Sequence, residues 1–242
     1  MSDNKKRIII VGATSGIGRK MAELYVAKGC NVGITGRRKE LLDEIQSAYP
    51  NLIETECFDV TEKENKSHIE SLVKKLGGLD VLVYSSGIGE PSKELDWQLD
   101  KLTVQTNVNG FVEIANWGFN YFINQGHGSL AVISSVASHR GNSWAPAYSA
   151  SKAFQSNYFE GLSMKAHRMK KNISITCIEP GFVDTNMAKG NKLFWIVPVL
   201  KASRQIIDAI EKKKRRVYIS KRWWLIGKLI KLFPHWFLKK LS

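Results

Sequence analysis

Short apolar segments alternate with longer amphipathic segments along most of the chain. Seven segments rich in β-branched residues are predicted as strands, over residues 7–11, 31–35, 53–58, 80–85, 129–135, 173–178 and 216–220. Apolar residues recur with a helical period between them, over residues 17–28, 38–48, 62–76, 98–125, 146–170 and 201–213. Strands that are apolar at consecutive positions are buried on both faces, and helical connections make them parallel. The pattern therefore predicts a doubly wound α/β fold with about seven parallel strands and helices on both faces.

A glycine-rich turn, GATSGIG at residues 12–18, links the first predicted strand to the first predicted helix. Gly12 permits a tight turn, Gly16 lets the backbone approach a pyrophosphate, and Gly18 lets the helix pack close to the sheet. The amino terminus of that helix would face the anion. An ordinary glycine-rich turn is the alternative, but the position on the first strand of an α/β pattern favours a dinucleotide site in a Rossmann-like fold.

The end of the second predicted strand carries two arginines. An NAD site usually places an acidic residue there to bind the ribose hydroxyls, and this chain has Gly36 followed by Arg37 and Arg38. Guanidinium groups suit a 2′-phosphate, although arginines are also common at solvated helix starts. The sequence therefore favours NADP(H), with Arg37 as the better candidate, while NAD(H) stays possible.

A serine, a tyrosine and a lysine form a candidate catalytic group. Tyr148 and Lys152 are four residues apart and share one face of a predicted helix, and Ser135 lies at the end of the preceding strand. A nearby ammonium would lower the pKa of Tyr148 and make it a usable general acid and base. Each residue alone has a structural explanation in packing, surface exposure or capping, but the set favours carbonyl chemistry.

Several motifs together resemble the short-chain dehydrogenase/reductase family over roughly residues 6–220. They are GATSGIG (12–18), DV (59–60), SSG (85–87), NVNG (107–110), ISS (133–135), YSASK (148–152) and PGFVDT (180–185). The resemblance implies direct hydride transfer with a nicotinamide cofactor and a catalytic set of Asn107, Ser135, Tyr148 and Lys152. Tyr148 would protonate the developing alkoxide, and Lys152 would bind the nicotinamide ribose. Asn107 would help to place a water that relays protons to Lys152.

The resemblance also implies the cofactor contacts. Asp59 would hydrogen-bond the adenine, Val60 would lie beside it, and Thr185 would contact the carboxamide end. The remaining expected contacts come from the same motifs and are Thr14, Ser15, Ile17, Gly87, Pro180, Gly181 and Val183. Two positions depart from the family pattern: YSSG (84–87) replaces Asn-Asn-Ala-Gly, and Glu179 stands where the family often has Asn.

An apolar segment follows the last motif and is expected to form a lid over the substrate. NKLFWIVPVLKAS at residues 191–203 contains Phe194 and Trp195, and such a lid fits a lipophilic substrate. Packing of these residues under a helix is the alternative. Further candidates for the substrate pocket, beside Ser135, are His139, Trp144, Phe182 and Met187.

The carboxy-terminal segment, residues 221–242, differs from residues 1–220 in charge and pattern. The formal net charge is +14, and 13 of the 36 Lys and Arg residues follow residue 200, against two of the 22 acidic residues. On a helix its lysines share one face and its apolar residues the other, with Pro234 predicting a kink. This pattern favours a segment lying on an anionic membrane surface, ahead of a subunit contact and well ahead of nucleic acid.

The sequence thus predicts an NADP(H)-dependent oxidoreductase domain over residues 1–220 and a basic amphipathic tail over residues 221–242. Its substrate would be a lipophilic ketone or secondary alcohol, and the family resemblance implies a homodimer or homotetramer. The three widely spaced cysteines form no metal or disulfide pattern, so a cytoplasmic protein is expected, and the basic tail allows a peripheral position on the membrane. The alternative is a non-catalytic dinucleotide-binding regulatory or interaction protein.

Overall fold

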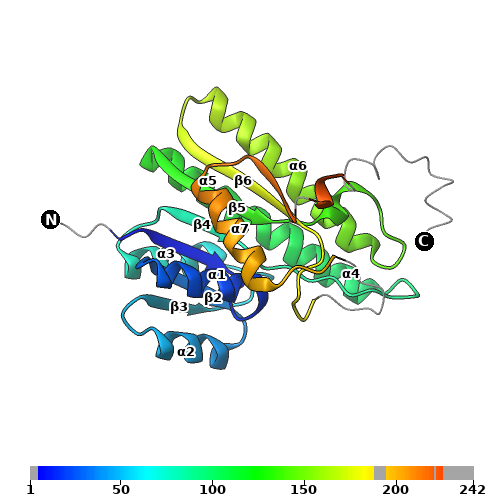
Figure 1. Cartoon of the computed structure of the whole chain (residues 1–242), viewed down its shortest axis with the longest axis horizontal. Coiled ribbons are helices and arrows are strands. Elements are labelled where there is room, and N and C mark those ends of the chain that lie inside the picture. Colours follow the sequence, from blue (N-terminus) through cyan, green and yellow to red (C-terminus); the bar gives the residue numbers. More distant parts are fainter. Residues whose placement is uncertain (1–4, 188–194, 221, 226–242) are drawn as a thin grey trace.

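The computed structural model describes residues 5–187, 195–220 and 222–225, and its centre is a seven-stranded sheet (Figure 1). The strand order is β3-β2-β1-β4-β5-β6-β7. The strands are β1 (Arg7–Val11), β2 (Asn31–Gly36), β3 (Ile53–Cys57), β4 (Val81–Tyr84), β5 (His127–Ile133), β6 (Asn172–Pro180) and β7 (Arg216–Ile219). Every pair of neighbouring strands is parallel, so all carboxyl ends lie along one edge of the sheet.

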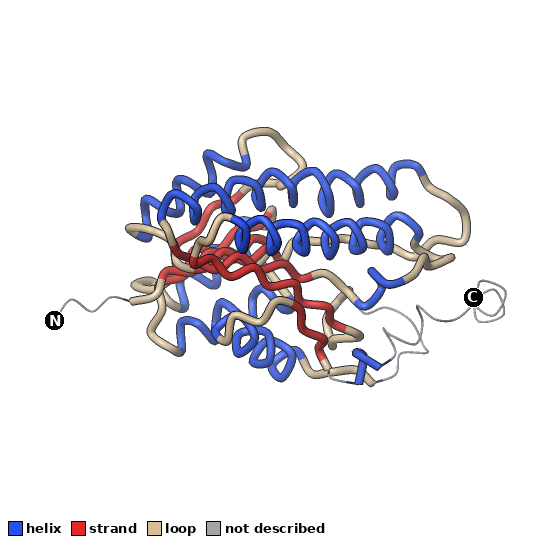
Figure 2. Tube along the Cα trace, turned by 90° about the horizontal axis from the view of Figure 1, so that it is seen from above, coloured by secondary structure: helices blue, strands red, loops and turns tan. Residues whose placement is uncertain are grey.

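Helices cover both faces of this sheet, as Figure 2 shows. One face carries α1 (Gly16–Ala27), α2 (Lys39–Ala48) and α7 (Val199–Glu211), and the other carries α3 (Asn65–Leu76), α5 (Phe111–Gln125) and α6 (Pro146–Arg168). Alternate residues of β1 belong to different cores: Ile8 and Ile10 pack with the first group, and Ile9 and Val11 with the second. Because side chains alternate along a strand, both faces are buried, which explains the continuous apolar pattern of the strands.

The predicted doubly wound fold is confirmed, but the longest predicted helix is divided into three parts. The segment expected as a single helix over residues 98–125 consists of α4 (Trp97–Val104), a π-helical turn η1 (Gln105–Gly110) and α5. Such a turn interrupts the regular backbone hydrogen bonds of a helix and is frequent at functional sites. Here it contains Asn107, one of the predicted catalytic residues.

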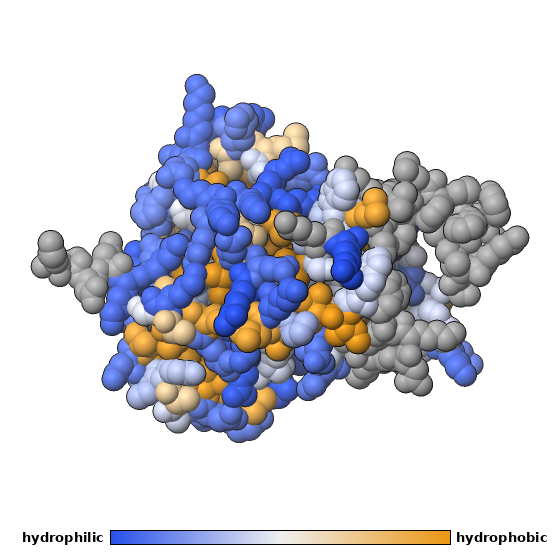
Figure 3. Space-filling view, in the orientation of Figure 1, coloured by the Kyte–Doolittle hydropathy of each residue, from blue (hydrophilic) through white to orange (hydrophobic). Residues whose placement is uncertain are grey.

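The predicted tail falls almost entirely outside the described residues. Only residues 222–225 of it are described, and they form one helical turn after β7. Among the residues that the structure describes, no helix combines the length and the apolarity needed to cross a membrane. Figure 3 shows that hydrophilic residues dominate the face of the molecule that it presents, with hydrophobic residues exposed between them.

Candidate active site

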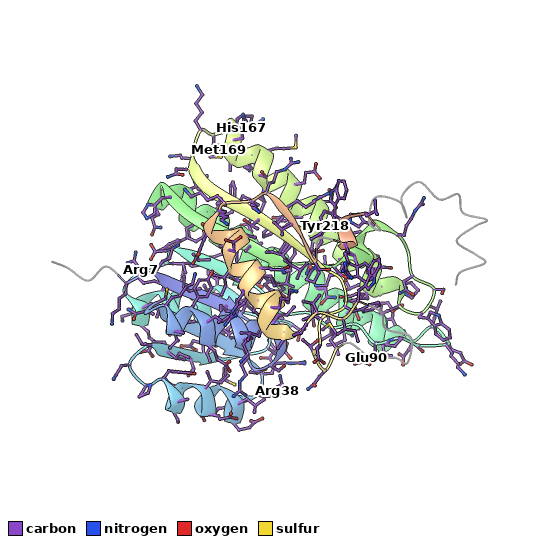
Figure 4. All side chains as sticks on the ribbon, viewed as in Figure 1. Arg7, Arg38, Glu90, His167, Met169 and Tyr218 are labelled. Atoms are coloured by element: carbon purple, nitrogen blue, oxygen red, sulfur yellow. The ribbon has the colours of Figure 1, made fainter. Side chains whose placement is uncertain are left out.

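A cavity of about 950 Å³ lies at the carboxyl edge of the sheet, where the loops after the strands meet. Figure 4 shows which edge this is: Arg7 lies at the amino end of β1, and Arg38 follows β2 at the opposite, carboxyl edge of the sheet. Most of the residues that the sequence predicts for the site line this cavity. They are Gly12, Thr14, Ser15, Gly16, Ile17, Arg37, Arg38, Asp59, Val60, Gly87, Ser135, Trp144, Tyr148, Lys152, Pro180, Gly181, Phe182, Val183, Thr185 and Met187.

The glycine turn between β1 and α1 forms one end of the cavity. Gly12 has a φ of +84°, and a Cβ there would lie 2.6 Å from the backbone nitrogen of Ser86. A Cβ at Gly18, which is buried and does not line the cavity, would overlap the carbonyl oxygen of Gly12. Glycine is therefore required at both positions, and the bare turn with the amino terminus of α1 fits a pyrophosphate.

The two arginines after β2 hold different partners. Arg37 Nη1 lies 3.2 Å from Asp59 Oδ2, while Arg38 donates to the hydroxyls of Thr14 and Ser15 in the glycine turn. Burial raises the pKa of Asp59, but hydrogen bonds from Thr61 and the charge of Arg37 outweigh burial and keep that pKa below its usual range. The arginines thus bring two cations to the adenosine end of the cavity, with one acidic group already paired.

Gly36 explains why no acidic side chain occupies the end of β2. A Cβ at this position would lie 2.5 Å from Cγ2 of Thr14, so the glycine turn packs directly against the bare backbone. An aspartate or glutamate there would have to displace Thr14, which Arg38 contacts. The packing of the glycine turn on Gly36 therefore disfavours an acidic residue at the position where one usually binds the ribose hydroxyls.

Tyr148 lies against the loop after β4, and the hydroxyl of Ser135 lies near its phenol. Its ring packs so closely on Gly89 that a Cβ there would overlap it, and the Ser135 hydroxyl accepts from the nitrogen of Ala137 at 3.1 Å. Burial raises the pKa of Tyr148, and the nearby Ser135 hydroxyl offsets only part of the rise. The predicted lowering by Lys152 is therefore not found in this structure, and the tyrosine holds its proton at neutral pH.

Lys152 is buried behind Tyr148 and is turned toward neutral acceptors. Its Nζ donates to the carbonyl of Ile133 at 2.9 Å and to Gln155 Oε1 at 3.0 Å, and it lies 5.7 Å from the centre of the Tyr148 ring. Burial lowers the pKa of Lys152 to about 8. The hydrogen bonds of the ammonium go to these two groups and not to the phenol, so Lys152 does not offset the effect of burial on the pKa of Tyr148.

Asn107 is buried beneath the cavity and does not line it. Its side-chain amide donates to the Ile88 carbonyl at 2.8 Å and to Ser151 Oγ at 2.9 Å, and its Oδ1 accepts from the Ile88 nitrogen at 2.9 Å. Its main-chain carbonyl accepts from Gln155 Nε2 at 2.9 Å. Asn107 therefore ties the loop after β4 to α6, and its carbonyl points toward the neighbourhood of Lys152.

His139 does not line the cavity, contrary to the sequence prediction. Its side chain is 4% exposed, and its Nε2 lies 2.9 Å from Oε2 of the fully buried Glu179. The same carboxylate accepts from Ser156 Oγ at 3.0 Å and lies 3.6 Å from Arg216 Nε. The carboxylate at the end of β6, unusual for the family pattern, thus attracts the histidine away from the substrate side.

The end of the cavity near Phe182 includes a residue that the sequence pattern places in the tail. Trp223, 4% exposed, lines the cavity and packs edge-on against Phe182, with ring centres 5.4 Å apart. The ring of Trp195 packs on Trp223, with ring centres 6.1 Å apart, but Trp195 does not line the cavity. Phe194 lies outside the described residues. The signal that could have revealed Trp223 is its place directly after β7, where the chain returns to the carboxyl edge.

Comparison of the sequence and the structure with those of known proteins identifies the family of this chain. The family model described as short chain dehydrogenase matches residues 6–193. An uncharacterised oxidoreductase of Myxococcus xanthus is 31% identical over 84% of this chain and 81% of its own, and a hydroxysteroid 11-beta-dehydrogenase 1-like protein of Gallus gallus is 27% identical over 90% and 79%. The crystal structure of a short-chain dehydrogenase from Streptomyces avermitilis has a TM-score of 0.82 at 27% identity, covering 96% of this chain and 94% of that one.

The chain therefore belongs to the short-chain dehydrogenase/reductase family. It is an oxidoreductase that acts on CH–OH groups and uses a nicotinamide dinucleotide. The glycine turn, where a Cβ at Gly12 or Gly18 would overlap neighbouring backbone, fits the pyrophosphate of such a cofactor.

Proposed function

We propose that this protein reduces a lipophilic ketone, or oxidises the corresponding secondary alcohol, with NADP(H). The observation that carries the proposal is that Ser135 and Tyr148 line the same cavity, with the Ser135 hydroxyl near the phenol and the Lys152 ammonium 5.7 Å from the centre of the Tyr148 ring. The intact set gives no support to the alternative of a non-catalytic binding protein, since a protein without turnover has no need of a tyrosine and a lysine arranged in this way.

In the proposed reaction Ser135 Oγ donates a hydrogen bond to the carbonyl oxygen and holds it beside Tyr148. When bound, the nicotinamide supplies a hydride to the carbonyl carbon. The Tyr148 hydroxyl gives its proton to the oxygen as negative charge develops there. Lys152 would bind the nicotinamide ribose, since its ammonium lies behind the Tyr148 ring and the residue lines the cavity. In the oxidation direction Tyr148 removes the alcohol proton.

The preference for NADP(H) is supported by the surroundings of the second strand's end. Arg37 and Arg38 line the adenosine end of the cavity, and an acidic side chain in place of Gly36 would have to displace the side chain of Thr14. A 2′-phosphate would find two guanidinium groups there and no unpaired carboxylate, since Arg37 pairs with Asp59.

A lipophilic substrate is supported by the side chains at the other end of the cavity. Trp144, Phe182, Met187 and Trp223 provide aromatic and thioether surface there. Such surface favours burial of an apolar molecule, and the few polar groups near it, chiefly Ser135 and Tyr148, fix one oxygen. The name of the Gallus gallus relative, which refers to a hydroxysteroid, is in keeping with a bulky apolar alcohol.

Two further properties are proposed from the sequence pattern. Residues 221–242 would bind an anionic membrane surface through their lysines and aromatic residues. Flotation with anionic liposomes, compared with the chain truncated before Lys221, tests this, and equal flotation would exclude it.

Subunits would pair through helices α4, α5 and α6, supported by the exposed side chains of Val104, Phe154 and Met164. Light scattering during size-exclusion chromatography gives the oligomeric state.

The test of the reaction is a panel of lipophilic ketones with NADPH in mild detergent, using wild type and Tyr148→Phe. Turnover in the variant is expected to fall by at least about 100-fold while NADPH binding persists, because only the hydroxyl is removed. Tyr158→Phe, which alters another tyrosine of α6 packed on Phe111, is the matched control and should retain turnover. Equal turnover in wild type and Tyr148→Phe would exclude the mechanism.

A further inference from the structure

A buried glutamine joins two residues of the proposed catalytic set. Gln155 follows Lys152 by three residues on α6 and therefore shares its helix face, and it is 0% exposed. Its Nε2 donates to the main-chain carbonyl of Asn107 at 2.9 Å, and its Oε1 accepts from Lys152 Nζ at 3.0 Å. One side-chain amide thus bridges α6 and the π-helical turn η1 beneath the cavity.

The orientation of this amide is determined by its two partners. A carbonyl oxygen only accepts hydrogen bonds, and an ammonium only donates them. If the amide of Gln155 were reversed, its nitrogen would face the Lys152 ammonium and its oxygen would face the Asn107 carbonyl. Both contacts would be repulsive, so the bridge has a single arrangement.

This bridge joins the two residues, Asn107 and Lys152, between which the family resemblance implies a water. A water both accepts and donates protons, whereas an amide passes a proton only through its unfavourable imidic acid form. We propose that Gln155 replaces that water as a positioning residue: its amide clamps the Lys152 ammonium to the Asn107 carbonyl and ends the internal proton route there. Protons exchanged at Tyr148 then enter through the cavity.

The bridge through Gln155 also affects where the third N–H group of the Lys152 ammonium points. The Ile133 carbonyl and Gln155 Oε1 each take one N–H of the ammonium. The third faces Gly87, where a Cβ would lie 3.1 Å from Nζ and which lines the cavity. With two N–H groups held by the protein, the ammonium presents one donor to the cavity on the inner side of the Tyr148 ring.

Among the groups around Lys152, Gln155 is the position at which a substitution can change the protonation of the lysine. Tyr148 lies on the same helix, and Cys177 faces the ammonium from β6. Burial raises the pKa of Cys177 to about 12, so that thiol is neutral when Lys152 titrates. Glu179 of β6, with His139 of η2 (Val136–His139) and Arg216 of β7 beside it, lies beyond the hydroxyl of Ser156.

The inference rests on the proposed function for the roles of Tyr148 and Lys152, but its test does not need turnover. The chain without cofactor, labelled with ¹³C at lysine Cε, is titrated by NMR, and the Lys152 signal is assigned by its loss in Lys152→Arg. In Gln155→Met the ammonium loses an acceptor, so its titration midpoint should fall by about one pH unit. In Gln155→Glu it gains a carboxylate, so the midpoint should rise by about one unit or more.

Opposite shifts from two substitutions at one position are the supporting result, because a merely structural role would not move the midpoint in both directions. Gln125→Met is the matched control: that amide donates to the carbonyls of Leu79 and His127 far from the cavity, and its loss should leave the midpoint unchanged. An unchanged midpoint in both folded Gln155 variants overturns the clamp.

A crystal structure of the wild-type chain tests the same point if a variant does not fold. A water between Lys152 Nζ and the Asn107 carbonyl, with the Gln155 amide turned away, overturns the proposal, while the direct bridge supports it. Failure of the proposed function is a separate result, since it would appear as absent turnover in the wild type whatever the titrations show.

Discussion

Oε2 of Glu179 and Nε2 of His139 lie 2.9 Å apart, and both side chains are buried next to the turn that follows Ser135. The His139 ring also stacks on Tyr218 of β7, labelled in Figure 4, with ring centres 5.8 Å apart. Glu179→Ala would leave His139 without its carboxylate in a buried position. We expect the free energy of unfolding to fall by about 3 kcal/mol, measured by urea denaturation.

The control for Glu179→Ala is Glu160→Ala, which removes the other, half-exposed carboxylate partner of Arg216. That surface pair should contribute less than about 1 kcal/mol. Burial raises the pKa of Glu179, but the close contact with His139 and the charge of Arg216 outweigh burial and hold that pKa below its ordinary value. The stabilisation by Glu179 is therefore present above about pH 4.3 and is lost as the pH falls further. Equal losses in the two variants would contradict this assignment.

The raised pKa of Tyr148 predicts different pH profiles for the two reaction directions. Reduction needs the protonated phenol, which burial preserves at neutral pH, whereas oxidation needs the phenolate. We expect ketone reduction to be nearly constant between about pH 6 and 8, and alcohol oxidation to increase with pH over the same range and beyond it. Initial rates in both directions at saturating cofactor give the two profiles. An oxidation rate independent of pH would contradict the raised pKa.

The features predicted correctly from the sequence depend on short spacings. The glycine turn is contained within residues 12–18, and Tyr148 and Lys152 are one helical turn apart, so local pattern alone brings them to the cavity. Gln155 lies on the same helix face and was accessible to the same reasoning. Its role depends on Asn107, however, and only the packing of η1 on α6 brings that carbonyl within reach.

The features that were missed depend on contacts between distant segments. His139 lies among residues that do line the cavity, but the adjacency of β5 and β6 places Glu179 beside it, and a buried carboxylate binds its side chain. Trp223 was assigned to the tail because the amphipathic pattern of the sequence changes at residue 221. Pattern describes an element's faces but not which other element covers them, so neither contact could be predicted.

The two arginines after β2 predict the cofactor preference of substituted chains. Arg38→Ala should weaken NADPH binding by about 10-fold or more, because a charge-assisted contact to the 2′-phosphate is lost, and should leave NADH binding unchanged. Arg37→Ala should have a similar effect, since it also frees the carboxylate of Asp59. Dissociation constants for both cofactors, measured by fluorescence titration, provide the comparison.

Lys39→Ala is the control for the arginine variants. Lys39 is the next basic residue along the chain, but it is paired with Asp43 and does not line the cavity. Its removal should change the affinities for NADPH and NADH equally or not at all. If the wild type binds NADH more tightly than NADPH, the assignment of the arginines to a 2′-phosphate is wrong.

Trp223 predicts that the first turn after β7 affects which carbonyls are accepted. Its indole is buried against Gly181 and Phe182 in the cavity wall, whereas Trp224 beside it is 46% exposed and does not line the cavity. Trp223→Ala removes aromatic surface from the substrate end, so KM for a bulky lipophilic ketone should rise by about tenfold. For a small ketone the KM should change little, because a small molecule reaches Ser135 and Tyr148 without contacting that wall.

Trp224→Ala is the matched control, since it removes the same side chain from the neighbouring, exposed position and should leave both KM values unchanged. Gly181→Ala gives an independent check, because a Cβ at residue 181 would overlap the Trp223 indole and force it out of its position. The two variants Trp223→Ala and Gly181→Ala should therefore raise KM for the same bulky ketones. Equal KM values in wild type and Trp223→Ala for large and small ketones alike would show that this tryptophan does not contact the substrate.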